Sequence, residues 1–225
     1  MWNEFNIKTF PAETIVYRNG VFEPELSTLT EPENINKKYD TPIHIIYVGK
    51  IEGENTLNIN LDLENQPVFL SINIKNNFPA FLNIFIKNAG KNSKIRGHIL
   101  SQNSSDLVVK ITAEHSAPDT GILLQTKIIG KKDSFSKISG TVIIDKNCEN
   151  TESNICFAGI ATDKSAKIQF TPEQKISSVP EFAEHSAYMF HILPTQELYL
   201  RESGLSGAEV ETAMIESFMN DFNLF

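Results

Sequence analysis

The middle of the chain alternates apolar and polar residues many times, and this pattern constrains the fold more than any other feature. The clearest case is residues 57–63, Leu-Asn-Ile-Asn-Leu-Asp-Leu, where every second side chain is apolar. Because successive side chains of a β-strand point to opposite faces, the pattern predicts strands with one buried face. Similar runs, many of them about 11 to 15 residues apart, lie at residues 68–74, 81–86, 107–112, 122–129, 135–144 and 166–170.

Turn-forming residues separate these runs, and no helical stripe interrupts them between residues 43 and 176. Such a series fits a β-sandwich, an antiparallel barrel or a β-helix of stacked coils. The Asn-Gly and Asp-Gly pairs of tight hairpins are absent from the run, and asparagines such as Asn58, Asn73 and Asn83 suit stacked turns. No repeat of fixed length singles out the β-helix, so the pattern leaves the three architectures open.

The two flanks differ from this β-rich run. Residues 1–42 form a lead-in with scattered prolines, and residues 184–191 are expected to link the β body to a helical segment over 194–225. Gly204 is expected to end a short helix over about 196–203, and the Ser-x-x-Glu spacing of residues 206–209 predicts the start of a longer one. The apolar face of that helix either packs on the β body or docks in a partner's groove; it contains Val210, Met214, Phe218 and Phe222.

The charge balance argues against some partners. The formal net charge is −8, whereas a surface that binds nucleic acid or an anionic membrane needs a basic footprint. The first residues lack the basic start and apolar core of a signal peptide, and no apolar run approaches the ~18 residues that span a bilayer. We therefore expect a cytoplasmic protein. Cys148 and Cys156 are separated by seven residues, which is not a spacing of zinc or cluster ligands, and we expect two reduced thiols.

No motif of enzyme chemistry stands out. The chain lacks a phosphate-binding P-loop, a Gly-x-Ser-x-Gly elbow and a His-Glu-x-x-His pair. Paired acids on a β-helix can hydrolyse glycosides, but the sequence does not show two of them meeting. A neutral imidazole can bind iron or accept a proton, although an isolated histidine is more often structural. The five histidines are His44, His98, His115, His185 and His191.

Several short motifs occur in an order that one protein family shares. Residues 14–27 are similar to the short hairpin that precedes the core of SufD proteins, and residues 115–120 and 127–140 are similar to a Thr-His…Lys…Gly succession in that core. Residues 179–182 and 197–206, with Tyr-Leu-Arg-Glu-Ser-Gly, are similar to the two closing signatures. Together these motifs resemble the SufB/SufD family of iron–sulfur cluster assembly proteins, and SufD most closely, over about residues 14–220.

The resemblance implies a right-handed parallel β-helix over residues 43–193, between the lead-in of residues 1–42 and a C-terminal α-helical hairpin over 194–225. We expect the large helical N-terminal domain of the family to be absent. The resemblance also implies a non-catalytic scaffold that pairs with a SufB-like protein and docks a SufC-like ATPase on its C-terminal helices. The resemblance leaves open whether the chain forms a homodimer, and it implies neither a nucleic acid nor a membrane as a partner. The candidate partner-binding residues are Arg201, Val210, Met214 and Phe218.

In the family, a cysteine and a histidine between the closing signatures lie at the SufB–SufD interface, where the nascent cluster forms. His191 matches that histidine best and is the candidate cofactor-binding residue, whereas Met189 stands in place of the cysteine. We therefore expect no stably bound cofactor or metal, and only a transient Fe–S cluster at the partner interface. The second arginine of the Tyr-Leu-Arg signature is also replaced.

Two other classes of function stay open from the sequence. One is a β-rich protein- or carbohydrate-binding module without a role in iron–sulfur chemistry, and the other is a β-helical hydrolase with paired acids. A secretion signal would favour both, and none is found. Within the family, a paralogue that kept the fold and lost cluster work would also explain the missing cysteine.

Overall fold

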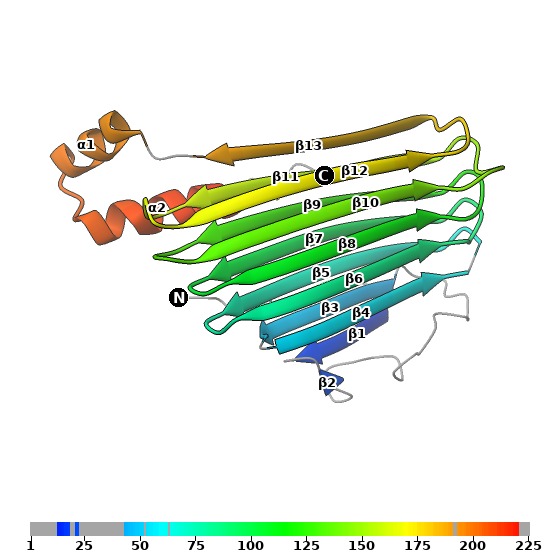
Figure 1. Ribbon diagram of the computed structural model, residues 1–225, viewed down its shortest axis with the longest axis horizontal. Coiled ribbons are helices and arrows are strands. Elements are labelled where there is room, and N and C mark those ends of the chain that lie inside the picture. The colour runs from blue at the N-terminus through cyan, green and yellow to red at the C-terminus, as the bar shows by residue number, and fades with distance from the viewer. Residues whose placement is uncertain are drawn as a thin grey trace.

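The chain forms a stack of parallel β-strands followed by two helices (Figure 1). The computed structural model describes residues 13–18, 21–22, 43–51, 53–62, 64–190 and 193–220. The strands form two sheets, which we call sheet A and sheet B. Sheet A contains β1 (Glu13–Arg18), β2 (Val21–Phe22), β3 (Ile43–Lys50), β5 (Pro67–Asn76), β7 (Lys94–Asn103), β9 (Gly121–Gly130), β11 (Glu152–Ala161) and β13 (Phe182–Phe190); sheet B contains β4 (Gly53–Leu61), β6 (Ala80–Asn88), β8 (Leu107–His115), β10 (Phe135–Ile144) and β12 (Lys167–Ile176).

From β3 onward, the chain alternates strand by strand between the two sheets. Each strand pairs in parallel with the strand two positions away along the chain. Two consecutive strands therefore make one coil, and five coils stack from β3 to β12 before β13 begins another. The predicted parallel β-helix is confirmed, and the β-sandwich and the antiparallel barrel are excluded. We refer to the stack from β3 to β13 as the solenoid.

The coils differ in length, which explains why the sequence shows no fixed repeat. Ile43 pairs with Val68, 25 residues later, and Val68 pairs with Ile95, 27 residues later. Farther along sheet A, Ile122 pairs with Ser153, 31 residues later. The strands from β3 to β12 all have 8 to 10 residues, so the corners between strands absorb the difference.

The inward side chains fill the space between the sheets with rows of aliphatic residues. Ile43, Val68 and Ile95 occupy equivalent positions in successive coils, and all three are buried. Burying such a side chain stabilises the fold by roughly 1.5–3 kcal/mol. Where a larger side chain crosses the interior, a glycine faces it: a Cβ atom on Gly140 would lie 2.5 Å from Cζ of Phe157.

The corner that leads from sheet B to sheet A has the same backbone feature in successive coils. Asn65, Asn92, Asp119 and Asn150 have φ angles between +55° and +57°, a left-handed conformation that Asn and Asp adopt more readily than other non-glycine residues. The corners also bond to one another, because Nδ2 of Asn150 donates to Oδ1 of Asp119 at 3.2 Å. The same backbone conformation thus recurs at this corner from coil to coil.

The asparagines that suggested stacked turns are not the ones in the corners. Asn58, Asn73 and Asn83 lie within β4, β5 and β6. They lie within the alternating runs, which form strands. The turns are formed by the short segments between the runs. The prediction was right about stacked turns and wrong about which residues form them.

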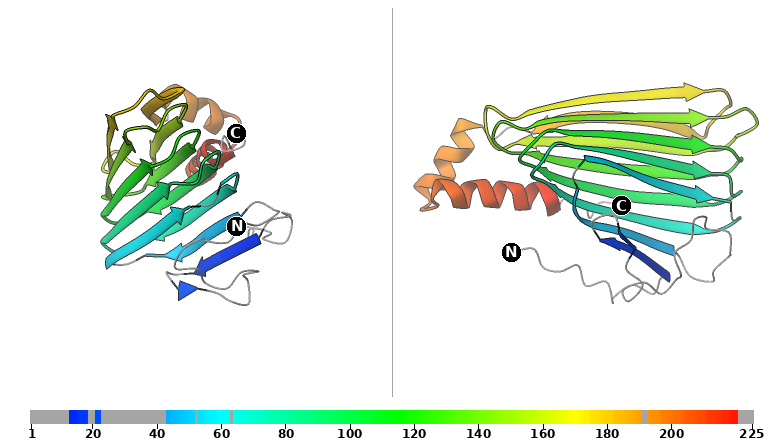
Figure 2. Two further views of the ribbon diagram at one scale, coloured as in Figure 1. Left: turned by 90° about the vertical axis from the view of Figure 1, so that its right-hand side faces the viewer. Right: turned by 60° about the horizontal axis from the view of Figure 1, so that its bottom comes forward.

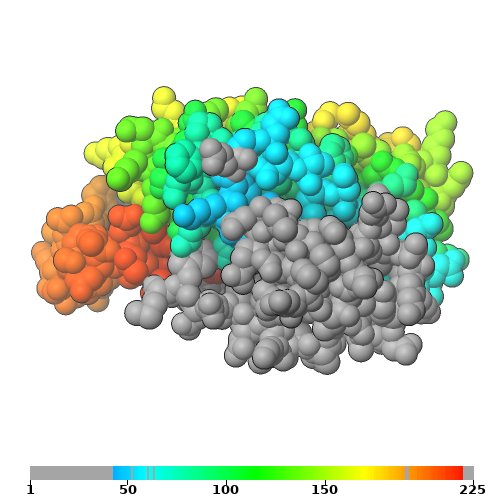
Figure 3. All heavy atoms as spheres, turned by 90° about the horizontal axis from the view of Figure 1, so that it is seen from below, coloured from blue at the N-terminus to red at the C-terminus, as the bar shows by residue number. Residues whose placement is uncertain are grey.

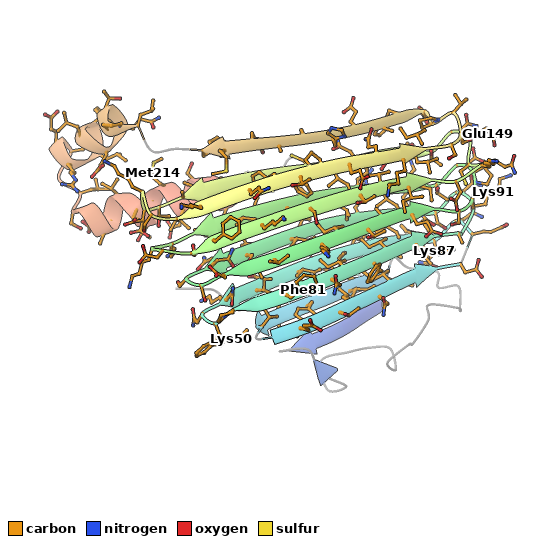
Figure 4. The ribbon with its side chains drawn as sticks, viewed as in Figure 1. Lys50, Phe81, Lys87, Lys91, Glu149 and Met214 are labelled. Carbon is orange, nitrogen blue, oxygen red and sulfur yellow. The ribbon has the colours of Figure 1, made fainter. Side chains whose placement is uncertain are left out.

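Charged side chains connect neighbouring coils around the same corner (Figure 4). The ammonium of Lys87 lies 2.7 Å from a carboxylate oxygen of Glu114, and Lys94 reaches past one coil to Glu152 at 2.5 Å. Gly121 lies under the Lys94 side chain, where a Cβ atom would come within 3.0 Å of it. The hydrogen bond from Lys87 lowers the pKa of Glu114. Lysine and glutamate side chains of different coils thus pair along the stack.

Two short strands precede the first coil. β1 pairs in parallel with β3, and β2 pairs antiparallel with β1, so that Tyr17 lies opposite Phe22. This antiparallel pair falls within residues 14–27, where the resemblance to SufD places a hairpin. Most of the predicted lead-in of residues 1–42 lies outside the described residues.

Two helices extend from one end of the solenoid (Figures 2 and 3). α1 (Pro194–Glu202) ends just before Gly204, which has a φ of +95°, and α2 (Gly207–Asn220) begins after Ser206. The Ser206 hydroxyl donates to the Glu209 carboxylate at 2.7 Å, so the predicted capping box and helix stop are both confirmed. The link predicted over residues 184–191 is wrong, because β13 continues sheet A through most of it.

Candidate functional site: the C-terminal end of the solenoid

The solenoid ends in two exposed strand edges. β13 is the last strand of sheet A and β12 the last of sheet B, and within the described residues neither has a strand on its outer side. Figure 1 shows both at the end of the stack opposite β1. An edge strand presents backbone N–H and C=O groups that can pair with a strand from another chain. This end therefore offers two adjacent edges for strand addition.

The side chains of β13 place aromatic groups at this end. Tyr188 and Phe190 point to the outer side of sheet A, with ring centroids 5.2 Å apart, and both are partly exposed. Met189 points inward instead, and a Cβ atom on Gly159 would lie 2.7 Å from its sulfur. Met189, which stands in place of the family's cysteine, is thus a packing residue in β13.

The candidate cofactor-binding residue, His191, lies outside the described residues. It follows β13 directly in the sequence. His185, on β13 itself, is exposed and pairs in register with Ile155 of β11. Within the described residues, no three histidine, cysteine, aspartate or glutamate side chains are placed to hold a metal ion.

α1 exposes most of its surface. None of its residues is buried, and Leu198 and Tyr199 are 56% and 70% exposed. The candidate residue Arg201 also lies on this helix, where its guanidinium contacts the Glu197 carboxylate at 2.7 Å. Large apolar side chains that remain exposed on a short helix mark a surface that a partner can cover.

α2 turns one side to the solenoid and leaves the other free. Val210 and Phe218 are buried, and Met214, labelled in Figure 4, is half-buried. Phe218 packs with Ile215 against apolar residues of β9 and β11, and its ring lies 5.4 Å from that of Phe190. In this structure, the apolar face that the sequence left between packing and docking is packed on the β body at Phe218.

A buried lysine under α2 was not among the predicted site residues. Nζ of Lys127, on β9, donates to the carbonyl oxygen of Phe218 at 2.5 Å and lies 5.1 Å from the centre of the Phe218 ring. The side chain is 1% exposed. A cation near the C-terminal end of a helix stabilises the carbonyl groups there, and the ring adds a cation–π contact. In the sequence Lys127 follows two other polar residues, Gln125 and Thr126, so no local signal singled it out.

The two cysteines lie in different environments, and both are free thiols. Cys148 is buried, its Sγ lies 3.4 Å from the carbonyl oxygen of His115, and burial raises its pKa. It therefore has little thiolate at neutral pH. Cys156 lies on the outer side of β11 and is half-exposed. The two cysteines do not pair with each other in this structure.

His115 is an interior residue. Its Nδ1 lies 2.8 Å from Oγ1 of Thr120, whose hydroxyl donates to the carbonyl of Ala117. Thr120 must then accept a proton from Nδ1, so the Nε2 atom carries none. Burial lowers the pKa of His115 to about 4. This histidine is a neutral, structural residue at neutral pH.

No helix in the described part of the chain is long and apolar enough to span a membrane.

Comparison with known proteins identifies the architecture. The family model described as SUF system FeS cluster assembly, SufBD core domain, matches residues 75–218, more than half of the chain. The match runs from β5 through the open end to α2, so it includes both exposed edges and both helices. A search of curated proteins gives no match. The chain belongs to the SufB/SufD core-domain family of the SUF iron–sulfur cluster assembly system.

Proposed function

We propose that this chain is a SufD-like, non-catalytic scaffold component of the SUF assembly complex. It pairs with a SufB-like protein at the open end of the solenoid and docks a SufC-like ATPase on its two helices. The observation that carries the proposal is the exposed apolar surface of α1, with Leu198 and Tyr199 uncovered. The nascent cluster is cargo at the interface with the SufB-like partner, near His191.

The open end supports pairing with a second solenoid. The outer edges of β12 and β13 have backbone groups available for strand addition. Tyr188 and Phe190 lie beside those edges and supply large apolar contact area, and aromatic residues contribute strongly at protein interfaces. A partner with a similar end would extend both sheets at once.

The helices support docking of the ATPase. Of the four candidate partner-binding residues, Arg201 is exposed and Met214 is half-buried, so these two are available to a partner. Val210 and Phe218 are buried, and Phe218 contributes by fixing α2 on the solenoid. Leu198 and Tyr199 join them as candidate contacts, because each exposes most of its side chain.

A movement of the helices can reach the strands through Lys127. This residue joins the last described turn of α2 to β9, and β9 pairs along its full length with β11, which pairs with β13. We propose that closure of the ATPase on ATP shifts α2, and that the shift passes through β9 and β11 to the interface near His191. The chain contributes geometry to cluster assembly, while the ATPase contributes energy.

Co-expression of this chain with the SufB-like and SufC-like proteins of the same genome tests the proposal. We expect a stoichiometric complex on affinity purification, and loss of the ATPase alone when Leu198 and Tyr199 are both changed to Glu. Phe85→Glu is the matched control, because Phe85 is 45% exposed on β6 of sheet B, which is neither an open edge nor one of the helices. A folded chain that captures neither partner would refute the scaffold function.

The interface role of His191 needs a separate test. His191→Ala should leave the complex and the folding of the chain intact, and should lower the maturation of iron–sulfur client proteins. His185→Ala, on the exposed part of β13, is the control. Normal client maturation in the His191 variant would remove His191 from the mechanism and leave the docking proposal untouched.

A further inference from the structure

The outer face of sheet A carries a shallow groove across β7, β9 and β11, three strands that lie side by side (Figure 1). Its lining includes Arg96 and His98 of β7, Gln125 of β9, and Asn154 and Cys156 of β11. His98, Gln125 and Cys156 are register partners in one row across these strands. Since neighbouring strands lie about 4.8 Å apart, one small molecule can contact the whole row.

Cys156 is the accessible thiol of the two cysteines. It lies on the outer side of β11 and is half-exposed. Cys148, in contrast, is buried, and its Sγ lies 3.4 Å from the carbonyl oxygen of His115. Disulfide exchange requires a thiolate to reach a sulfur atom of another molecule, so its rate depends on access. Cys156 is therefore the thiol that can take part in such an exchange.

Two oxygen atoms of the groove lack hydrogen-bond donors. Oε1 of Gln125 and Oδ1 of Asn154 are buried, and within the described residues neither accepts a hydrogen bond. Gln125 as a whole is only 7% exposed, and both residues line the groove. A buried acceptor without a donor is unfavourable. The groove is therefore suited to a ligand that brings N–H groups to these two oxygens.

The guanidinium of Arg96 selects the charge of a ligand in the groove. Arg96 is exposed, and in the described part of the chain it forms no ion pair. In its row toward the open end, the first acid is Glu184 of β13, three strands away. Burial, and next the charge of Lys127, lower the pKa of His98, so this imidazole is neutral at pH 7. Because a guanidinium binds a carboxylate through two hydrogen bonds, the groove favours an anionic ligand over a cationic one.

We propose that Cys156 forms a reversible mixed disulfide with a low-molecular-weight thiol that carries carboxylate and amide groups. The Cys156 thiolate, whose proton has gone to solvent, attacks one sulfur of the disulfide form of this thiol. A new S–S bond joins Cys156 to one half, and the other half leaves as a thiolate with the electron pair of the broken bond. Cys156 is thereby oxidised and the departing half is reduced. In the product, Arg96 binds a carboxylate, and amide N–H groups donate to Gln125 and Asn154.

This inference goes beyond the proposed function, and its test uses the isolated chain, so the result does not depend on partner binding. We compare exchange with oxidised glutathione, which carries carboxylates and amides, with neutral hydroxyethyl disulfide and with cationic cystamine. Each rate is divided by the rate with a free cysteine derivative, which removes the intrinsic reactivity of the disulfide. Cys156 should prefer oxidised glutathione over hydroxyethyl disulfide about tenfold, which corresponds to about 1.4 kcal/mol, and cystamine should react least. Peptide mass spectrometry locates the adduct, and buried Cys148 should stay unmodified.

Matched variants assign this preference to the groove. Arg96→Gln should reduce the preference for oxidised glutathione severalfold and Arg96→Lys should keep most of it, whereas Lys137→Gln, at an exposed position on β10, should leave it unchanged. Gln125→Leu should slow exchange with oxidised glutathione and leave exchange with hydroxyethyl disulfide unchanged. Equal relative rates for the three disulfides, or an Arg96→Gln variant with the full preference, would overturn the proposal. So would modification of Cys148 as fast as that of Cys156, since the reaction would then not depend on the groove.

Discussion

β9 and β10 belong to the same coil, yet one is buried on both faces and the other on one. In β10, buried and more exposed residues alternate along the whole strand, with Ser139 and Thr141 pointing outward. In β9, nine of ten residues are buried, including the outward-facing Lys127 and Ile129. The difference arises because α2 covers the outer side of β9, whereas no helix in the described residues covers β10.

This contrast shows what the inward and the outward side chains of a coil indicate about their surroundings. The inward positions are mostly apolar in both strands, with Thr126 and Ser136 as buried exceptions, because the interior must be filled, so they carry information on the fold alone. The outward positions depend on what lies against them, so they carry information on docking. β9 is therefore buried on both faces, as a strand covered on both sides is, although Gln125, Thr126 and Lys127 in its middle are polar. β10 has the alternation of a strand with one face in water.

Removing an inward side chain should have the largest effect. Phe157 is fully buried and stacks on Phe170 with ring centroids 5.5 Å apart. Phe157→Ala should lower the free energy of unfolding by about 3–5 kcal/mol, because a cavity replaces the ring. Phe78→Ala, at a corner where the ring is mostly exposed, should cost about 1 kcal/mol or less. Urea unfolding measures both, and similar losses would show that the interior is not tightly packed.

The second largest effect should be a loss of folding stability at acidic pH, caused by His115 in the interior of the solenoid. The pKa of His115 is lowered from 6.5 to about 4 in the folded chain, so the unfolded chain binds the proton first as the pH falls. Stability is therefore fully present above pH 6.5 and is lost by about 1.4 kcal/mol per pH unit down to pH 4, roughly 3 kcal/mol in total. His115→Asn should remove this part of the pH dependence. Equal slopes of unfolding free energy against pH in both proteins would contradict the buried neutral state.

Truncating an outward lysine of β9 should have a smaller effect on the free energy of unfolding, and truncating one of β10 should have almost none. Lys127→Ala removes the donor to the Phe218 carbonyl and should lower the free energy of unfolding by about 2 kcal/mol. Lys137→Ala is the matched control on β10, where the side chain is exposed, and should change it by less than about 0.5 kcal/mol. Limited proteolysis within α2 gives a second readout. Equal effects would mean that α2 does not rely on β9.

The smallest effect concerns the start of α2, away from both strands. Ser206→Ala removes the capping box with Glu209 and should lower stability by about 1 kcal/mol. Hydrogen exchange in the first turn of α2 should quicken, while exchange in β9 should stay unchanged. Ser217→Ala, on the exposed side of the same helix, is the control. Faster exchange in β9 as well would show that the whole helix holds the coil together.

The sequence alone predicted the features that depend on local chemistry. The alternating runs gave most of the strands, Ser206 and Glu209 gave the start of α2, and Gly204 gave the end of α1. The resemblance to SufB and SufD was needed to choose the β-helix, because coils of 25 to 32 residues show no constant period. β13 was missed because Glu184, His185 and Ser186 are all exposed polar residues at the open end, where no further coil demands alternation.

The candidate site could be predicted only in part. The apolar face of α2 was recognised from its spacing, but the sequence does not tell whether Phe218 meets the β body or a partner. Lys127 could not be assigned, because its burial depends on a contact 91 residues away in the sequence. The groove at Cys156 likewise assembles from β7, β9 and β11, three segments that only the stacking brings together.

The unequal coil lengths have a practical consequence for engineering. Since the strands stay the same length while the corners vary, the corners already accept several extra residues without loss of strand pairing. The corner between β10 and β11 belongs to the coil with the longest spacing between paired residues in sheet A. It is distant from both helices along the chain. A short reporter sequence inserted at residue 147 should therefore lie on the outside of the stack. It would allow the chain to be followed during assembly while both of its ends remain untouched.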